Sequence, residues 1–234
     1  MYFAEGIPYF IVNNISVTMF TKMGVPNGEM ALFTSLLYLP WTLKPLWSPL
    51  VDIFRTKRWW IVMMQALVSA AFVLLALTLP SPETSTQVPM SLFTFTLLLF
   101  VFAAFASATH DIAADGFYMI ALDSGKKSFF VGIRSTFYRL SSIFGQGVLV
   151  VVAGVLEEKT GNIPLAWSLT IGLTAVIFTV LTVYHTFALP RPAGDSAVST
   201  DGSGSAGEFA KAFASFFRKP GVWIAIIFML LYRL

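Results

Sequence analysis

The chain has 234 residues, of which 56% are hydrophobic and only 12% are charged. Soluble domains carry about 25% charged residues, so this composition excludes an ordinary soluble domain and indicates a membrane protein. The net charge of +3 is too small to indicate a nucleic-acid partner, and the absence of cysteine excludes disulfides and thiolate metal sites.

Long, continuous apolar runs predict an all-α membrane protein. A hydrocarbon core about 30 Å thick needs about 20 helical residues per crossing. The runs lack the alternation that is typical of membrane β-strands. The expected spans cover roughly residues 2–20, 29–50, 59–79, 90–120, 130–156 and 164–188, and a seventh is expected to begin near residue 220.

The residues after the sixth expected span form the one long polar stretch. Its middle, A-G-D-S-A-V-S-T-D-G-S-G-S-A-G-E, has the composition of a flexible linker. Four phenylalanines then predict a short amphipathic helix at the membrane surface: Phe209, Phe213, Phe216 and Phe217. We therefore expect a six-helix bundle at 1–188, a linker with a short helix at 189–219, and the truncated start of a second bundle at 220–234.

Positive charges gather in alternate loops. If the N-terminus is cytoplasmic, nine basic residues fall in the inside loops: Arg55, Lys57, Arg58, Lys126, Lys127, Arg191, Lys211, Arg218 and Lys219. Only Lys22 and Lys159 fall in the outside loops. Because cytoplasmic loops are enriched in Lys and Arg, the sequence predicts a multi-pass protein with a cytoplasmic N-terminus.

The loop after the second expected span reads W-S-P-L-V-D-I-F-R-T-K-R-W-W. Six helices, a linker and a further helix resemble the layout of the major facilitator superfamily, whose two six-helix halves are related by an axis along the membrane normal. That superfamily carries an acidic residue followed by basic residues in this loop. The residues that resemble this signature are Asp52, Arg55, Lys57 and Arg58, while Ser48 and Ile53 depart from it. They are expected to be a gating loop or, alternatively, a basic turn that topology alone requires.

The first two expected spans carry isolated polar residues. Glu5 is a candidate proton carrier or cavity wall, and Asn13 is a candidate solute contact. In the second span, Tyr38 and Lys44 are candidate solute contacts. Lys44 is expected to bind an anionic solute, to pair with a facing carboxylate or to snorkel to the interface. Three prolines predict that this helix is bent: Pro40, Pro45 and Pro49.

The fourth expected span contains two carboxylates, Asp111 and Asp115, on one face and one turn apart. An ionisable group at bilayer depth costs roughly 2.5–3.5 kcal/mol, so such groups persist where they pair or handle a charge. Neighbouring carboxylates cannot both ionise cheaply. We therefore expect them to pair with arginines of the next helix or to carry a coupling proton, and we expect His110 to form a structural hydrogen bond.

The fifth expected span carries a polar stripe at helical spacing: Ser135, Arg139, Ser142 and Gln146. In a membrane such a stripe must face a cavity or another helix. Arg139 is expected to bind an anionic solute, since a guanidinium binds carboxylate or phosphate through two hydrogen bonds. Arg134 is rotated about 140° from Arg139, and we expect it to form an ion pair with Asp111 or Asp115.

Four segments make the resemblance more specific: Y-F-A-E-G-I-P-Y at 2–9, L-P-W-T-L-K-P-L-W-S-P-L-V-D at 39–52, A-T-H-D-I-A-A-D-G-F-Y at 108–118 and F-Y-R at 137–139. They resemble the superfamily branch of the AmpG-type anhydromuropeptide permeases and the acetyl-coenzyme A transporters. The resemblance implies proton-coupled import of anhydromuropeptides through the bacterial inner membrane, by a protein of roughly twelve helices whose C-terminal half completes this chain.

The residues themselves fit a symporter, with cations for an anionic solute and carboxylates for protons. No phosphate-binding glycine loop, nucleophile elbow or HExxH motif is present, so neither an enzyme nor a cofactor is expected. The expected partners are a small solute, protons, the lipid bilayer and the C-terminal half. Two alternatives stay open: the same fold carrying another organic anion such as acetyl-coenzyme A, and a non-transporting sensor or scaffold.

Overall fold

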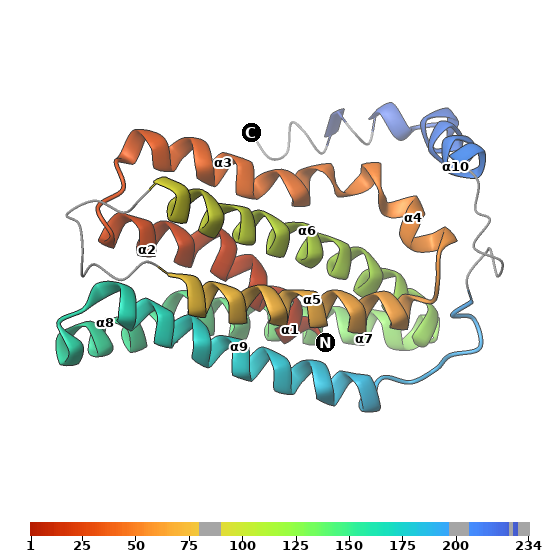
Figure 1. Ribbon diagram of the computed structural model, residues 1–234. Helices are drawn as coiled ribbons and strands as arrows, with labels where there is room; N and C mark the ends of the chain where they lie inside the picture. The colour runs from red at the N-terminus through yellow and green to blue at the C-terminus, as the bar shows by residue number, and fades with distance from the viewer. Residues whose placement is uncertain (80–89, 197–205, 225–226, 229–234) are drawn as a thin grey trace.

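The described residues of the computed structural model, 1–79, 90–196, 206–224 and 227–228, fold into helices alone (Figure 1). Four helices are long and apolar enough to cross a membrane: Lys57–Thr78, Phe93–Ala121, Phe129–Thr160 and Ile163–Ala188. They correspond to the third to sixth expected spans. The expected seventh span falls largely outside the described residues.

The first two expected spans are not among these four helices, and each is divided into shorter segments. The first consists of α1 (Tyr2–Phe10), the π-helical turn η1 (Ile11–Ile15) and α2 (Ser16–Lys22). The second consists of α3 (Asn27–Leu43), the 3₁₀ turn η2 (Lys44–Leu46) and α4 (Ser48–Ile53).

The predicted bend of the second segment is confirmed. The α-helix ends just before Pro45, where proline removes a backbone donor and its ring clashes with the preceding turn. Trp47 then takes a non-helical conformation (φ −117°, ψ 1°) before α4 begins, with Pro49 in its first turn. The break gives Lys44 a position at the end of a helix rather than inside one.

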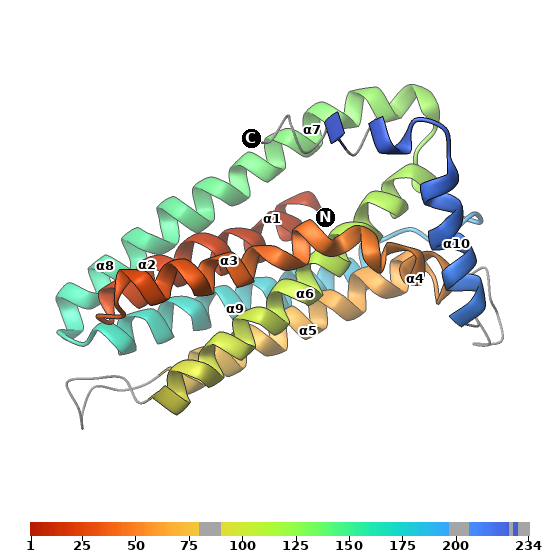
Figure 2. The same ribbon diagram turned by 90° about the horizontal axis from the view of Figure 1, so that it is seen from above.

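The remaining spans are longer. They are α5 (Lys57–Thr78), α6 (Met90–Ala121), α7 (Ser124–Ser142) continued by the π-helical turn η4 (Ile143–Val148) and α8 (Leu149–Thr160), and α9 (Ile163–Ala188). Helix α5 packs against both α6 and α9, while α1 packs against α6 and α7. Figure 2 shows α7 and α8 along one edge of the bundle and α5 with α6 along the opposite edge.

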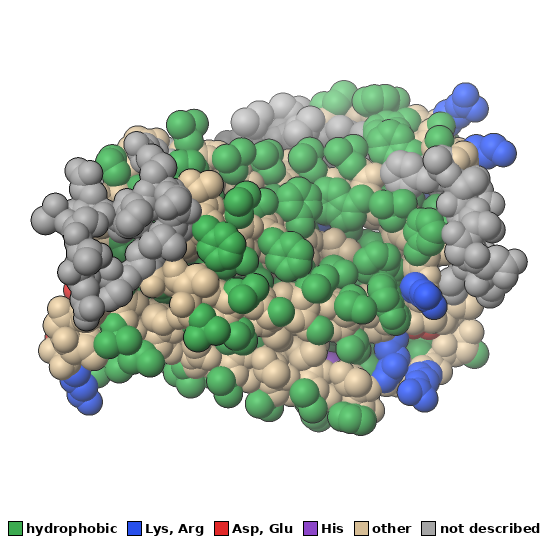
Figure 3. Space-filling view, in the orientation of Figure 1, with side chains coloured by type: hydrophobic (Ala, Val, Ile, Leu, Met, Phe, Trp, Pro, Cys, Tyr) green, Lys and Arg blue, Asp and Glu red, His purple; other side chains and the backbone are tan. Residues whose placement is uncertain are grey.

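The interior and the outside of the bundle are both apolar. The largest buried side chains include Trp167, Phe72, Phe100 and Phe178. On the face shown in Figure 3, hydrophobic side chains cover the middle of the molecule, and Lys and Arg lie toward its ends, mostly at one of them. Leu77 and Phe187 are 77% and 83% exposed. Such an outer surface suits lipid rather than water.

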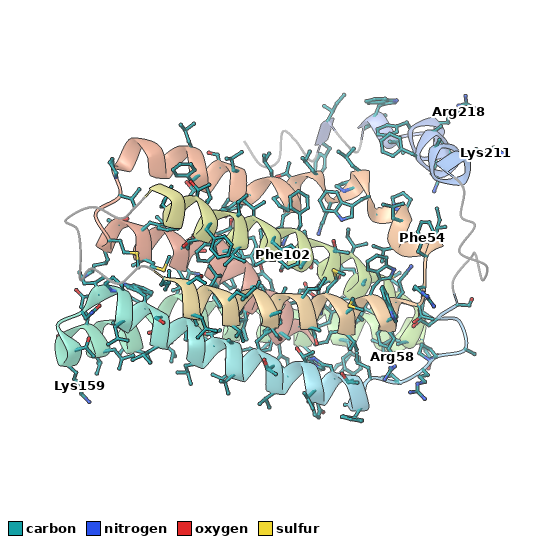
Figure 4. All side chains as sticks on the ribbon, in the orientation of Figure 1. Phe54, Arg58, Phe102, Lys159, Lys211 and Arg218 are labelled. Atoms are coloured by element: carbon teal, nitrogen blue, oxygen red, sulfur yellow. The ribbon has the colours of Figure 1, made fainter. Side chains whose placement is uncertain are left out.

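The two ends of the bundle differ in charge. Figure 4 places Arg58, Lys211 and Arg218 at one end and Lys159 at the other. The amphipathic helix expected in the linker is present as α10 (Ala206–Arg218), which packs near α4. The polar middle of the expected linker lies at 197–205, outside the described residues, whereas Asp195 contacts the start of α5.

Candidate functional site

Five charged side chains from four segments meet around the buried Glu5, the other four being half-buried, and we refer to them as the ion cluster: Glu5, Lys44, Asp111, Asp115 and Arg134. The Nζ atom of Lys44 lies 2.5 Å from Oδ2 of Asp111. Arg134 joins the other two acids, with Nη1 2.5 Å from Oδ1 of Asp115 and Nη2 3.5 Å from Oε1 of Glu5. The other carboxylate oxygen of Glu5, Oε2, is buried and has no hydrogen-bond partner among the described residues.

The helix breaks and helical spacing explain how these groups converge. Glu5 comes from α1 and is only 5% exposed. Asp111 and Asp115 lie one turn apart on α6, which contacts α3 on one side and α1 on another. Lys44 begins the 3₁₀ turn of the second segment and Arg134 lies on α7. The cluster therefore connects the first, second, fourth and fifth expected spans.

The ion-pair partners of Asp111 and Arg134 agree only in part with those expected. Arg134 contacts Asp115, one of the two expected partners. Asp111, however, takes its cation from Lys44 of the second span rather than from an arginine of the fifth. This contact confirms one of the three alternatives expected for Lys44, pairing with a facing carboxylate, and not the alternative in which Lys44 snorkels to the interface. The reason is that a turn at Pro45 directs the lysine toward α6 instead of along a continuous helix.

An aromatic ring borders the ion cluster. The guanidinium of Arg134 stacks over Tyr2, with Cζ 4.7 Å from the ring centroid. Tyr2 in turn meets the ring of Tyr118 edge-on at 5.9 Å. Tyr2 was not a candidate from sequence, because an aromatic residue at the start of an apolar run is also typical of an interface anchor.

A second group of aromatic rings surrounds Tyr9, which lies near the end of α1. We call it the aromatic cluster: Tyr9, Tyr38, Trp41 and Tyr138. The ring of Tyr9 packs against the other three at centroid distances of 5.1 to 6.3 Å. The hydroxyls of Tyr9 and Tyr38 lie 2.9 Å apart. Tyr38 was a candidate from sequence, whereas the other three were missed, because single aromatics in apolar spans are usually lipid-facing or core residues.

Two residues of the polar stripe of the fifth span form side-chain hydrogen bonds, and the other two form none that the structure describes. Gln146 accepts a hydrogen bond from Asn14 Nδ2 at 3.3 Å and donates to Ser142 Oγ at 2.8 Å. Ser135 and Arg139 are exposed, and within the described part of the chain no hydrogen bond or ion pair reaches them. Arg139 is therefore a cation still available to a ligand.

Asn13, the candidate in the first span, does not reach this stripe. It is 7% exposed and its Nδ2 donates back to the carbonyl of Tyr9 at 3.1 Å. The next residue, Asn14, makes the contact to Gln146 instead. Both asparagines lie in the π turn η1, where the extra residue changes the phase of the helix.

Two glycines let α1 approach the fifth span closely. A methyl group on Gly6 would overlap Ser141, and one on Gly145 would lie 2.8 Å from Cβ of Phe10. Gly145 thus serves the close packing expected of small residues in membrane helices. The two π turns, η1 and η4, also contact each other.

The basic loop between α4 and α5 is held by defined contacts. Lys57 forms an ion pair with Asp52 and donates to the carbonyl of Val51 at 3.2 Å. Its stem lies over Gly116 of α6, where a Cβ atom would lie 2.9 Å from Cε of Lys57. Arg55 has a positive φ of 60° and stacks over Trp59 at 5.9 Å.

Arg58 is turned toward the end of α9. It donates to the carbonyls of Thr186 and Leu189, the latter at 3.2 Å. In return, Asp195 accepts hydrogen bonds from the backbone N–H groups of Lys57 and Arg58 at 2.6 and 3.0 Å. The loop residues therefore join α4, α5, α6 and α9 at the basic end of the bundle.

His110 forms the structural hydrogen bond that was expected of it, with Gln65 of α5 at 2.9 Å. Gln65 also bonds His185 of α9.

Comparison with known proteins matches the amino-acid sequence to a family. The family description "Major Facilitator Superfamily" fits residues 1–233, almost the entire chain. The chain belongs to the major facilitator superfamily. Its apolar helices and this membership make it a multi-pass membrane protein.

Individual relatives within the superfamily carry AmpG names. The chain is 31% identical over 190 residues to "Putative transporter AmpG 4" of Rickettsia conorii and 30% identical over 192 residues to the protein of the same name from Rickettsia felis. Each match covers 77% of this chain and 41% of the relative. An uncharacterized protein of Schizosaccharomyces pombe is 28% identical over 148 residues, which cover 59% of this chain and 28% of that protein.

The expected resemblance to the AmpG-like branch of the superfamily is thereby confirmed. The chain spans less than half the length of the AmpG-named relatives it matches.

Proposed function

We propose that this chain forms the N-terminal half of a secondary active transporter that imports an anionic solute together with protons. The observation that carries the proposal is the composition of the ion cluster. It holds three acids (Glu5, Asp111, Asp115) and two cations (Lys44, Arg134), so its formal charge is −3 + 2 = −1 when all are ionised.

A proton is the simplest way to neutralise this excess charge. An uncompensated charge in the membrane interior is expensive, whereas a protonated carboxyl is not. Glu5 is only 5% exposed, and the Oε2 atom of its carboxyl is buried with no hydrogen-bond partner among the described residues, so we assign the proton to this carboxyl. Release of this proton to one side of the membrane, and its replacement from the other, supports coupling to a proton gradient.

The solute is proposed to bind beside this cluster, where exposed and unpaired groups remain. Arg139 supplies a guanidinium for a carboxylate or phosphate. The hydrogen-bonded chain of Asn14, Gln146 and Ser142 supplies amide and hydroxyl groups at the same face of the fifth span. Anhydromuropeptide, with its several carboxylates, is the cargo that the AmpG resemblance favours.

In the membrane, all six expected spans are proposed to cross, including the two divided segments. The basic end, with Arg58 and Arg218, is placed in the cytoplasm by the positive-inside rule. The unpaired face at Arg139 is proposed to be completed by the C-terminal half of the same transporter, in the bacterial inner membrane.

The test uses the full-length protein in proteoliposomes with an imposed pH gradient and radiolabelled anhydromuropeptide. Arg139→Ala is expected to raise KM about 10- to 100-fold, since a charged hydrogen bond contributes about 1.5–3 kcal/mol. Asp115→Asn removes one carboxylate from the ion cluster and is expected to abolish gradient-driven accumulation. Lys159→Ala and Glu158→Gln are the matched controls, because they remove one charge each at exposed positions away from the site.

The possible outcomes distinguish an error in the proposed transport activity from an error in the proposed site residues. Accumulation lost in Asp115→Asn but kept in both controls supports proton coupling through this cluster. Folded wild-type protein without uptake contradicts anhydromuropeptide as the cargo. Uptake unchanged in Arg139→Ala and Asp115→Asn contradicts the site while leaving transport in place.

A further inference from the structure

Gln65 lies at the centre of a buried polar group outside the candidate site. Its Nε2 is 2.9 Å from Nε2 of His110, and its Oε1 is 3.0 Å from Nδ1 of His185. We call these three residues the imidazole cluster. They are 0%, 3% and 4% exposed, respectively. One side chain of α5 thus joins α6 and α9.

The two hydrogen bonds determine how each imidazole is used. A glutamine amide offers one acceptor oxygen and one donor NH₂ group. In the orientation described here, His110 accepts at Nε2 and His185 donates from Nδ1. Reversing the amide exchanges these roles but still uses both rings. Neither ring can turn away without leaving a polar group unpaired in an apolar interior, which is unfavourable.

The other contacts of α5 in this region are mainly apolar. Phe72 packs edge-on against Phe178 of α9 at 5.9 Å, and both belong to the same buried core as Phe100 of α6. Apolar contacts have little directionality, and lipid chains are as apolar as these side chains. Such contacts hold the helices together but define their rotation weakly. The directional hydrogen bonds of Gln65 define it more sharply.

Rotation of α6 matters because His110 and Asp111 are consecutive residues. Their side chains project about 100° apart around the helix. With His110 held toward α5 and α9, Asp111 faces Lys44 at 2.5 Å. We propose that Gln65 is a positioning residue, whose hydrogen bond to His110 sets the direction of the Asp111 carboxyl in the ion cluster. Its effect on transport rests on the proposed function, in which this cluster carries the proton.

Three variants of the full-length protein test the proposal. Gln65→Met removes both hydrogen bonds at similar volume. The double variant Gln65→Met/His110→Phe also removes the nitrogen of His110 that Gln65→Met leaves unpaired, so the contact with α6 becomes apolar on both sides while the tether stays absent; His185 is unpaired equally in both variants. Ser69→Ala is the control, because it removes a buried hydroxyl one turn away on α5 that bonds Thr182 and not His110.

The first readout does not depend on transport. Trp47 Nε1 lies 3.2 Å from Thr109 Oγ1, so the residue before His110 marks the rotation of α6 relative to the second segment. Cysteines at positions 47 and 109, in a background without other cysteines, are cross-linked with a short bifunctional methanethiosulfonate. The yield is expected to fall at least about threefold in Gln65→Met and in the double variant, and to stay unchanged in Ser69→Ala.

The second readout separates positioning from general damage. Gradient-driven accumulation is expected to fall about tenfold or more in Gln65→Met, while solute exchange without a gradient changes less than about twofold. Parallel loss of both activities, or wild-type cross-linking in Gln65→Met and the double variant, overturns the proposal. If wild-type protein shows no accumulation, the proposed function fails, and cross-linking alone still decides whether Gln65 orients α6.

Discussion

At the scale of single residues, the ion cluster derives its properties from partial burial. The side chains of Lys44 and Asp111 are 34% and 14% exposed, so their pair lies between a surface contact and a fully buried one. Surface pairs contribute about 0–1 kcal/mol, whereas breaking a buried pair costs about 3–5 kcal/mol. The expected contribution falls between these limits.

Asp111→Leu is therefore expected to destabilise the protein by about 1–3 kcal/mol, because Lys44 loses its counter-charge. Lys44→Met/Asp111→Leu is expected to recover most of that stability, since both charges are removed together. Thermal unfolding of the detergent-solubilised protein measures both variants. Equal stability of the single variant and the wild type would show that the pair contributes nothing.

Gly6 illustrates a second residue-scale constraint, the space between α1 and the fifth span. Gly6→Ala is expected to destabilise by about 1–3 kcal/mol, because its methyl group overlaps Ser141. Gly154→Ala, with open space around it, is expected to be neutral or stabilising by up to about 1 kcal/mol. Thermal unfolding compares the two, and a neutral Gly6→Ala would mean that α1 is free to move away.

At the scale of secondary-structure elements, the start of α5 and the end of α9 are capped by contacts at the basic end of the bundle. An α-helix leaves its first four N–H groups without intrahelical partners. The carboxylate of Asp195 accepts hydrogen bonds from the backbone N–H groups of Lys57 and Arg58. The side chain of Thr56 accepts one from the N–H group of Trp59 at 3.1 Å. Arg58 bonds two carbonyls at the end of α9. The segment that follows α9 thereby caps the start of α5, and Arg58 of α5 caps the end of α9.

Asp195→Ala is expected to cost about 0.5–2 kcal/mol, the usual effect of losing an N-cap acceptor. Hydrogen exchange of the first turn of α5 is expected to become faster, while exchange in the middle of α5 stays unchanged. Asp195→Asn keeps one acceptor oxygen, so its exchange rate in the first turn of α5 is expected to lie between those of the wild type and Asp195→Ala. Unchanged exchange in Asp195→Ala would contradict capping by this residue.

At the scale of the whole molecule, the charge difference between the ends predicts the orientation. The chain has no cysteine, so single cysteines can be placed at will. In intact cells, a membrane-impermeant maleimide is expected to label Lys159→Cys but not Lys211→Cys, which becomes reactive only after permeabilisation. The reverse pattern would contradict a cytoplasmic N-terminus.

The features that sequence could predict are those with local signals. Apolar length predicted the third to sixth spans, and Pro45 predicted the bend of the second, because proline acts on its own helix. Opposite charges at bilayer depth correctly suggested that Arg134 meets Asp115. The roles proposed for these residues in transport stay predictions.

The features that sequence missed depend on neighbours far along the chain. Pairing of Lys44 with a facing carboxylate was one expected alternative, but Asp111, 67 positions away, was not identified as the partner. Gln65 bonds a histidine 120 positions away. A lone glutamine in an apolar helix carries no signal of what it bonds. The π turns were also missed. The asparagine that bonds Gln146 is Asn14, whereas the candidate from sequence was Asn13.

Each π turn can also be understood as a built-in offset. It is an α-helical turn with one additional residue. Compared with a regular α-helix, that residue rotates the side chains before the turn by about 100° relative to the side chains after it. In the first span the offset separates Glu5, which faces the carboxylates, from the residues of α2. A one-residue deletion within η1 would leave a regular helix and a normal hydrogen-bond ladder, yet turn Glu5 away from its partners. The length of this segment, and not only its composition, is therefore part of the site.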